Sequence, residues 1–358
     1  MRRLRIPLGL LAAAAVAAAA AWFLWTSPGG GIDGDGEAIV RIPRGATLSA
    51  VADSLVAHDR LARRTVFVWG ARLSGRDRAI RAGRFSVPAG LSPRGLLRRL
   101  VSGPTVPVRV TVLEGETAAV TAESLAAAFP WSAAAFLAAA DSLVALRFPG
   151  DPEAYRAALR RERARTDRAF PLCEGYLHPE TYHFAEAVSA AHVAGVVLEH
   201  GLALWRRMMD AAPPRDADVL PGLHEVLTLA SIVEAETPRS DEMPRVAAVY
   251  LNRLTGGIAL EADPTVAHAV DKRGERILYV DLEVDSAFNT YRHRGLPPGP
   301  IGSPGPAAVD AVLRPATGFD ALFFVADGSG GHVFSRTLAE HREAVRRYRA
   351  LRESRTGR

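Results

Sequence analysis

Two carboxylates at the end of an apolar run are the residues of this chain best placed to do chemistry. The run EVLTLASIVEAET covers residues 225–237 and carries Glu234 and Glu236 near its end. At about 100° per residue, Glu236 falls roughly 70° from the centre of the apolar face and Glu234 roughly 90° from it, on the opposite side. A carboxyl at the shoulder of a buried face is partly desolvated, so its pKa rises toward the value that an acid catalyst needs near neutral pH. The alternative is a pair of solvated glutamates at a helix end.

The sequence carries none of the other common catalytic signatures. The chain has one cysteine, Cys173, and its histidines do not form HExxH, since His332 and His341 lie too far apart. Ser231 is not in a GxSxG elbow, and no P-loop or Rossmann pattern is found. The net charge of +5 is compatible with an acidic polymer or a membrane surface, but no basic stripe interleaved with aromatics favours nucleic acid. We therefore expect carboxylate chemistry without a metal or cofactor.

Length and composition allow a large buried core divided among several domains. The chain has 358 residues, of which 48% are hydrophobic, so two or three domains are expected. Strand-like and helical patterns follow one another irregularly, and residues 321–341 have the pattern strand, turn, strand, helix, with DGSGG as the hairpin turn. The sequence therefore predicts an α+β fold.

The N-terminus has the pattern of a membrane anchor. MRRLR is followed by an uncharged run, residues 6–25, that ends in two tryptophans. Twenty helical residues reach about 30 Å, the thickness of the hydrocarbon core. The arginines predict a cytoplasmic N-terminus, which places the rest of the chain outside the cytoplasm. A cleaved signal peptide is the alternative, but its apolar region is usually shorter than this run.

One short pattern occurs twice. Residues 45–55 (GATLSAVADSL) and 115–125 (GETAAVTAESL) share Gly, Thr, Ala, Ser and Leu, and each follows a strand-like run. Thr47 is a predicted N-cap at the start of the first helix. Two copies are too few for a solenoid, so they indicate two strand–turn–helix modules. The modules could bind a polymer or pack together, and the packing interpretation is favoured.

Seven segments form an ordered set of motifs. They are EGYLHPETYHF (174–184), SIVEAET (231–237), LNRL (251–254), ADPTV (262–266), FNTY (288–291), GLPPGPIGSPG (295–305) and FVADGSGGHVFSRTLAEH (324–341). In this order they resemble the endolytic murein transglycosylases of the MltG (YceG-like) family. The resemblance runs from the membrane segment to near the C-terminus. Its departures are local: Phe288 stands where the family often has Tyr, and Gly302-Ser303 lies within the proline-rich loop.

The resemblance implies a transmembrane helix, a small LysM-like α+β subdomain and a larger α+β catalytic domain. On this chain these parts are residues 1–28, 38–104 and 105–358, with a linker at 29–37. In the family the second glutamate of the VExE motif is catalytic, and by position that residue is Glu236. We also expect several polar residues in the substrate cleft, with structural hydrogen bonding as the alternative for each. They are Tyr176, Glu234, Asn252, Asp263, Asn289 and Tyr291.

The reaction that the resemblance implies is lytic cleavage of peptidoglycan. Glu236 would protonate the β-1,4 bond between N-acetylmuramic acid (MurNAc) and N-acetylglucosamine (GlcNAc), and its carboxylate would then deprotonate the C6 hydroxyl that closes a 1,6-anhydro ring. A hydrolytic muramidase and a non-catalytic peptidoglycan-binding protein are the alternatives. The family also implies work on nascent strands, as a terminator of elongation, at the extracytoplasmic side of the cytoplasmic (inner) membrane and beside peptidoglycan synthases (penicillin-binding proteins).

Overall fold

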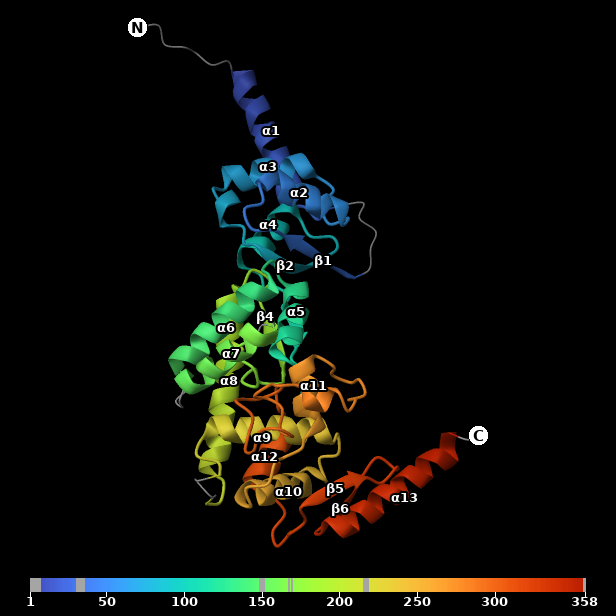
Figure 1. The fold of residues 1–358 in the computed structure, drawn as a ribbon. Coiled ribbons are helices and arrows are strands. Elements are labelled where there is room, and N and C mark those ends of the chain that lie inside the picture. Colours follow the sequence, from blue (N-terminus) through green and yellow to red (C-terminus); the bar gives the residue numbers. More distant parts are fainter. Residues whose placement is uncertain are drawn as a thin grey trace. The chain divides into compact units, whose positions relative to one another are not determined.

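The chain folds into two compact units in the computed structural model (Figure 1). The residues described are 8–29, 36–147, 152–166, 168, 170–214 and 219–356. Unit 1 comprises Met1–Arg109 with His183–Val188, and unit 2 comprises Val110–Tyr182 with Ser189–Arg358. Within the described ranges there are thirteen α-helices and three two-stranded sheets, one of which pairs β3 (Val108–Thr111) with β4 (Thr181–Phe184). The expected mixture of helices and strands is confirmed.

Unit 1 is organised around one antiparallel strand pair. β1 (Glu37–Ile42) pairs with β2 (Gly83–Pro88), and Glu37 lies opposite Pro88. Alternate residues of both strands are buried, as expected for a sheet with one face on the core. The helices of this unit are α1 (Leu8–Thr26), α2 (Leu48–Ala57), α3 (Arg64–Leu73) and α4 (Pro93–Ser102), with the short 3₁₀ helix η1 (Asp77–Ala79). The predicted LysM-like subdomain falls within this unit, and its likeness to LysM stays a prediction.

The helix α1 contains most of the predicted membrane segment, whereas residues 1–7, with their arginines, lie outside the described residues. Large apolar side chains of α1 are 54–70% exposed, and they are Leu11, Val16, Trp22 and Phe23. Near its end, Trp25 packs so closely on Gly70 that a Cβ there would lie 2.3 Å from the indole ring. In the part of the chain that is described, no helix combines the length and apolar character needed to cross a bilayer.

The repeated sequence pattern forms the same local structure twice. Gly45 and Gly115 both have φ of +74°, the left-handed region in which glycine is favoured. The hydroxyl of Thr47 accepts a hydrogen bond from the N–H of Ala50, so the predicted N-cap is confirmed. Thr117 caps α5 in the same way. The two copies are therefore strand–turn–helix modules, one in each unit.

Unit 2 is mainly helical and surrounds one buried helix, α9 (Leu223–Glu236). Eight consecutive residues of α9, 226–233, are buried, and the helix packs against α8, α10, α11 and α12 (Figure 1). Burial on all sides explains why its sequence is an almost unbroken apolar run. The other helices of the unit are α5 (Ala118–Ala128), α6 (Ala133–Arg147), α7 (Pro152–Thr166), α8 (Ala190–Asp210), α10 (Met243–Thr255), α11 (Asp263–Val270), η2 (Asp281–Glu283), α12 (Pro306–Leu313) and α13 (Leu338–Thr356).

A β-hairpin completes unit 2. β5 (Phe323–Ala326) pairs with β6 (His332–Ser335), so that Phe323 lies opposite Ser335 and Ala326 opposite His332. The turn between the strands is fixed by Asp327, whose carboxylate accepts hydrogen bonds from Ser329 and from the N–H of Gly331. The helix α13 follows directly, which confirms the predicted order of strand, turn, strand and helix.

Candidate active site

Glu236 is the last residue of α9, and its side chain lines a cavity of about 470 Å³ in unit 2. This volume is in the range of about 300–1,000 Å³ that is usual for small-ligand sites. The side chains that line it come from α9, α10, α11, α13, the hairpin and the loops between them. They are Glu236, Tyr250, Arg253, Leu260, Glu261, Asp263, Tyr291, Phe323, Phe324, Val325, Ala326, His332, Leu338 and His341.

The surroundings of Glu236 favour its neutral form. Burial at the end of an apolar helix raises the pKa of the Glu236 carboxyl from 4.5 to about 7. A hydrogen bond from Tyr250 opposes the shift, and the negative charge of Asp263 adds to it. A carboxyl of this kind holds a proton near neutral pH and can release it to a substrate oxygen, which is the property that general acid catalysis requires.

Tyr250 fixes the orientation of that carboxyl. Its hydroxyl donates to Oε1 of Glu236 at 2.6 Å, and its ring meets Phe324 edge-on at 5.6 Å between centroids. Burial and the neighbouring carboxyl raise the pKa of the Tyr250 phenol far above its usual value, so this hydroxyl stays a donor. Since Oε1 is occupied, Oε2 of Glu236 is the oxygen left to carry the transferable proton.

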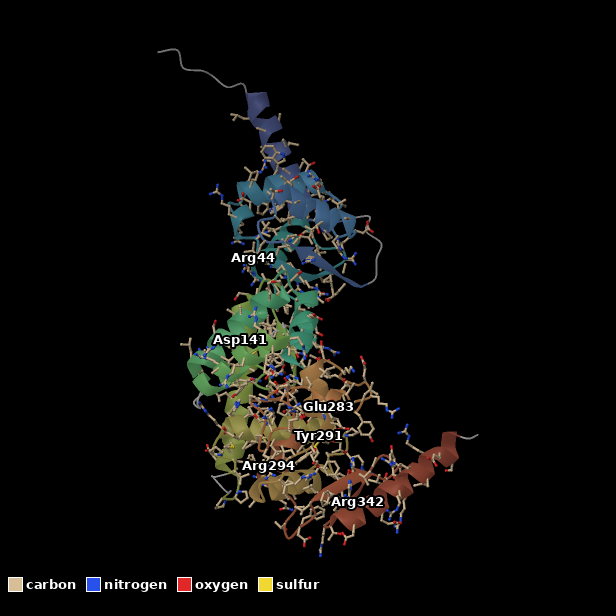
Figure 2. All side chains as sticks on the ribbon, viewed as in Figure 1. Arg44, Asp141, Glu283, Tyr291, Arg294 and Arg342 are labelled. Carbon is tan, nitrogen blue, oxygen red and sulfur yellow. The ribbon has the colours of Figure 1, made fainter. Side chains whose placement is uncertain are left out.

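Two of the predicted cleft residues meet in the cavity. The hydroxyl of Tyr291, labelled in Figure 2, donates to Oδ1 of Asp263 at 2.6 Å. Asp263 is placed by the start of α11, where Pro264 occupies the first turn. Burial and this hydrogen bond raise the pKa of the Tyr291 phenol. The structure thus brings Asp263, Tyr291 and Glu236 to one cavity, and contact of the first two with substrate stays a prediction.

An ion pair between Arg253 and Glu261 is a second polar group in the cavity, and the backbone of Glu261 is strained. Glu261 has φ of +51°, a conformation that non-glycine residues seldom adopt and that is frequent at functional sites. Its carboxylate accepts a hydrogen bond from Arg253 at 2.5 Å, and the Arg253 guanidinium lies 5.3 Å from the centre of the Phe323 ring. The cavity therefore offers charged groups beside aromatic faces, the combination that suits a sugar with both polar edges and apolar faces.

Two other predicted residues are engaged in holding loops. The amide of Asn252 donates to the carbonyls of Phe319 and Ala321, at 2.8 and 3.0 Å. Asn289 is fully buried and donates to the carbonyls of Leu282 and Val284, both at 2.8 Å. Neither side chain lines the cavity of Glu236. Substrate contact by these two asparagines stays a prediction, while their structural role is visible.

Tyr176 and Glu234 also lie apart from the cavity lining. The hydroxyl of Tyr176 is 2.6 Å from Nδ1 of His224, whose Nε2 is 2.8 Å from the carbonyl of Pro298 in the proline-rich loop. Glu234 accepts the N–H of Gly305, at the other end of the same loop, at 3.0 Å. Both residues thus hold the loop that leads into α12.

A raised carboxyl pKa alone does not identify the site. Burial also raises the pKa of Glu174 to about 7, against the opposing effect of the positive charge of Arg273. The Glu174 carboxylate accepts the N–H of Ala118 at the start of α5, and Glu174 is absent from the lining of the cavity. Glu236 combines a proton held near neutral pH with a place in the lining of this cavity.

The sequence did not point to several residues of the cavity. Tyr250 shares a helical face with Val246 and Val249 and has the pattern of core packing. His332 and His341 were considered only as metal ligands, yet both line the cavity. Among the described residues, no group of three His, Cys, Asp or Glu side chains could hold a metal ion. The only sequence signal for the histidines was their place in the last of the seven motifs.

Comparison with known proteins gives consistent matches. The sequence profile of the YceG-like family matches residues 40–347. An endolytic murein transglycosylase of Bacillus subtilis is 30% identical over 86% of this chain and 84% of its own length. An endolytic murein transglycosylase of Streptococcus pneumoniae is 28% identical over 84% of this chain, which spans only 58% of that relative. A crystal structure of a YceG-like protein from Listeria monocytogenes superposes with a TM-score of 0.55, at 27% identity, and covers 87% of this chain and 99% of the other.

Proposed function

The chain belongs to the YceG-like family, and on that premise we propose that it is a lytic transglycosylase that cleaves peptidoglycan strands internally. The bond broken is the β-1,4 bond between MurNAc and GlcNAc, and the new end is 1,6-anhydroMurNAc. The observation that carries the proposal is Glu236, whose pKa is raised to about 7 and whose carboxyl opens into the cavity. The names of the relatives from Bacillus subtilis and Streptococcus pneumoniae support the same reaction.

In the first step Glu236 acts as the general acid. Its proton, carried on Oε2, passes to the glycosidic oxygen while the bond from that oxygen to C1 of MurNAc breaks. The GlcNAc side leaves with a free 4-hydroxyl. The positive charge that develops at C1 is stabilised by the carbonyl oxygen of the substrate's own acetamido group, as in substrate-assisted glycosidases. The hydrogen bond from Tyr250 stabilises the carboxylate that this step leaves behind.

In the second step the same residue acts as the base. The Glu236 carboxylate takes the proton of the MurNAc C6 hydroxyl, and O6 attacks C1 to close the anhydro ring. The proton that the carboxyl lost is thereby restored, and no water is consumed. One carboxyl with a pKa near 7 suits both steps, because it neither releases its proton too readily nor holds it too firmly.

Hydrolysis is the second candidate, and one observation favours it. Asp263 lines the same cavity, and its charge raises the pKa of Glu236, so two carboxylates share the site. Many glycosidases use such a pair, with one carboxylate to activate water. Against this role, Oδ1 of Asp263 already accepts the hydroxyl of Tyr291. The products separate the two reactions, because a hydrolysed end carries one more water than an anhydro end.

We also propose that the uncharged run at residues 6–25, most of which forms α1, anchors the protein in the cytoplasmic membrane as a single span, with the N-terminus in the cytoplasm and the chain beyond the anchor outside. Support comes from the uncharged run at residues 6–25 and from the exposed apolar side chains of α1. An enzyme held there would meet strands as they are made, so we further propose that it terminates their elongation beside peptidoglycan synthases. Cross-linking in intact cells, followed by detection of a bound synthase, tests that association.

Incubation of long, uncross-linked glycan strands with the purified full-length protein tests the activity. An internally cutting enzyme lowers the mean strand length early, before short fragments accumulate. The Glu236→Gln protein, which keeps the shape of the side chain but has no proton to give, should leave strand length unchanged. Binding without shortening by the wild-type protein would instead indicate a peptidoglycan-binding protein, and wild-type rates in the Gln variant would exclude Glu236 as the acid.

A further inference from the structure

His332 stands in the wall of the cavity that contains Glu236, and the mechanism above gives it no role. It is the first residue of β6, and its ring meets Phe324 edge-on at 5.3 Å between centroids. Phe324 in turn touches Tyr250, the residue that orients Glu236. A chain of ring contacts thus connects His332 to the catalytic carboxyl through side chains that all face one space.

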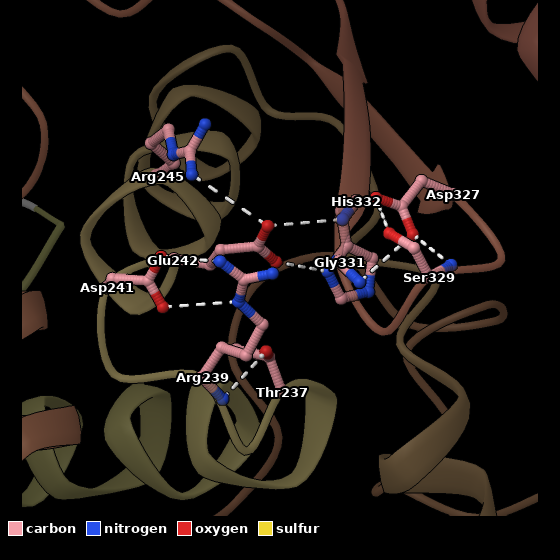
Figure 3. Close-up of polar contacts among 9 residues, drawn as sticks. All are labelled: Thr237, Arg239, Asp241, Glu242, Arg245, Asp327, Ser329, Gly331 and His332. Carbon is pink, nitrogen blue, oxygen red and sulfur yellow. Dashed lines mark hydrogen bonds and ion pairs between the residues drawn. The ribbon is translucent and has the colours of Figure 1, made fainter.

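A buried carboxylate holds the imidazole in place. Oε2 of Glu242 is 2.8 Å from Nδ1 of His332, and Oε1 accepts the backbone N–H of the same residue at 3.2 Å (Figure 3). The Glu242 side chain is only 6% exposed, and its nearest cation, Arg245, is 3.8 Å away. Burying a carboxylate is costly unless it is well hydrogen-bonded. The two hydrogen bonds from His332 offset part of this cost, and they fix the orientation of the imidazole.

The residues around the pair leave little freedom. A Cβ at position 331 would lie 2.7 Å from Oε1 of Glu242, so a larger residue there would displace the carboxylate. Asp327 fixes the preceding turn through Ser329 and the N–H of Gly331 (Figure 3). The hairpin, the start of α10 and the imidazole are therefore joined into one rigid piece of the cavity wall.

The hydrogen bond at Nδ1 determines what the other ring nitrogen offers. A carboxylate only accepts, so Nδ1 of His332 is the donor and Nε2 of the neutral ring carries a lone pair. Within the described residues Nε2 has no hydrogen-bond partner, and it is not among the buried polar atoms that lack one. An acceptor of fixed direction thus remains free in a wall of the cavity.

We propose that His332 is a substrate-binding residue whose Nε2 accepts a hydrogen bond from a sugar hydroxyl of the glycan, and that Glu242 is the positioning residue that holds it. This inference rests on the proposed function, because it assigns a contact within the same cleft. It also gives a purpose to the buried carboxylate and to the glycine beside it. The direction in which Nε2 accepts the sugar hydroxyl is fixed, because the imidazole ring can turn only by breaking its hydrogen bond to Glu242.

Two substitutions of similar size separate binding from structure. His332→Asn places an amide N–H where Nδ1 was, which keeps the contact with Glu242 but removes the acceptor in the cavity. His332→Gln reaches further and returns a carbonyl oxygen near the place of Nε2. We expect kcat/KM on glycan strands to fall about tenfold in the Asn variant, the usual effect of one lost hydrogen bond, and to recover in part with Gln. The unfolding midpoint should change little in the Asn variant.

The role of Glu242 is tested through His332. Glu242→Gln can accept only one of the two N–H groups of His332, so kcat/KM should fall in the otherwise wild-type protein. In the His332→Asn background the same change should cause no further loss, because a positioning residue has no effect without the residue it positions. Val333→Ala is the matched control, since Val333 is the exposed neighbour in β6 and does not line the cavity.

The outcomes distinguish this inference from the proposed function. If the wild-type protein does not shorten strands, the proposed function fails. If the wild-type protein is active and the Asn variant is equally active, the function stands and the role of His332 is refuted. A Gln variant that is less active than the Asn variant, or losses that multiply when Glu242→Gln is combined with His332→Asn, would show that the pair only supports the hairpin.

Discussion

Burial and hydrogen bonding shift the pKa of Glu236 in opposite directions. Burial raises the pKa of its carboxyl to about 7, and the hydrogen bond from Tyr250 lowers it. The protonated form starts the reaction, so kcat/KM should fall tenfold per pH unit above about pH 7. The pKa of this one group therefore determines the alkaline limit of the enzyme.

Removing the hydroxyl of Tyr250 should move that limit. In Tyr250→Phe the carboxylate loses the donor at 2.6 Å, so the pKa of Glu236 rises and the falling limb of the pH profile shifts to higher pH. The maximal rate should drop about tenfold, because the carboxyl loses its orientation. A profile of kcat/KM between pH 5 and 9 is the measurement. An unshifted limb would mean that a different group titrates there.

The same carboxyl should make the protein less stable as the pH rises. The folded-state pKa lies above the unfolded one, so the bound proton stabilises the folded chain fully below about pH 4.5, and this contribution is lost as the pH rises through about 7. Glu236→Gln removes the titration and should raise the free energy of unfolding at pH 8 by on the order of 2 kcal/mol, with little change at pH 4.5.

Denaturant unfolding of both proteins at the two pH values is the check. Glu174 titrates over the same range but is present in both proteins, so its contribution cancels. An equal difference at both pH values would show that Glu236 is not the buried acid that we describe.

The partly buried position of Glu236 could be predicted from the sequence, whereas its partners could not. The apolar run that places Glu234 and Glu236 at the shoulders of a buried face lies within one short segment, and the choice of Glu236 between them comes from the family motif. Tyr250 follows 14 residues later on a face that has the pattern of ordinary core, and Glu242 and His332 are 90 residues apart. Contacts of this kind depend on how helices and hairpin pack, which a single sequence does not reveal.

At the scale of elements, the end of α9 is joined to the proline-rich loop through Glu234. Its carboxylate accepts the N–H of Gly305, and the loop also pairs with the second repeat, where the N–H of Gly115 donates to the carbonyl of Ser303 at 2.7 Å. The second copy of the repeated pattern therefore packs against the loop beside the catalytic helix. That the two repeated modules pack together stays a prediction.

Glu234→Ala and Glu234→Gln should separate support from catalysis. The Ala variant loses the acceptor for Gly305 and should be about 1 kcal/mol less stable, with a moderate loss of activity. The Gln variant keeps an acceptor oxygen and should behave almost as wild type. Thermal unfolding and strand-shortening rates measure both effects. If Glu234→Gln were as inactive as Glu236→Gln, Glu234 would be a second catalytic carboxyl.

Local elements were well predicted because their signals are local. Thr47 caps a helix and DGSGG turns a hairpin, each within a few residues. Asn252 donates to carbonyls 67 and 69 residues away, and Asn289 donates to carbonyls within its own loop, so the polar residues that suggested a cleft are engaged in holding loops. Sequence spacing does not distinguish an amide that faces a substrate from one that faces a backbone.

At the scale of the whole molecule, the proposed anchor at residues 6–25 would hold the protein at the membrane. Arginine at the centre of a membrane helix costs about 3 kcal/mol per residue on insertion scales. Replacing Leu11 and Val16, both exposed on α1, with Arg should therefore release the protein from alkaline-washed membranes. Neither side chain is near Trp25, which packs on Gly70, so unit 1 should stay folded.

The matched control replaces the same two residues with Ala, which keeps the run uncharged. That protein should stay with the membrane fraction, and both variants should shorten soluble strands at the wild-type rate. Membrane retention of the Arg variant would refute the anchor.

The position of the anchor segment can be predicted from the sequence, because its signal is a continuous apolar run. The inclusion of His183–Val188 in unit 1 cannot, because that segment is distant in the chain and no local pattern assigns it to the unit.

The mass of the new glycan ends formed in water enriched in heavy oxygen shows most directly whether the MurNAc C6 hydroxyl or water attacks C1. We predict MurNAc ends that are one water lighter than hydrolysed ends and that contain no heavy oxygen, because O6 closes the ring. The Glu236→Gln protein should form no new ends. Reducing ends that carry heavy oxygen would show hydrolysis, and anhydro ends formed at the wild-type rate by the Gln variant would exclude Glu236 as the catalytic acid.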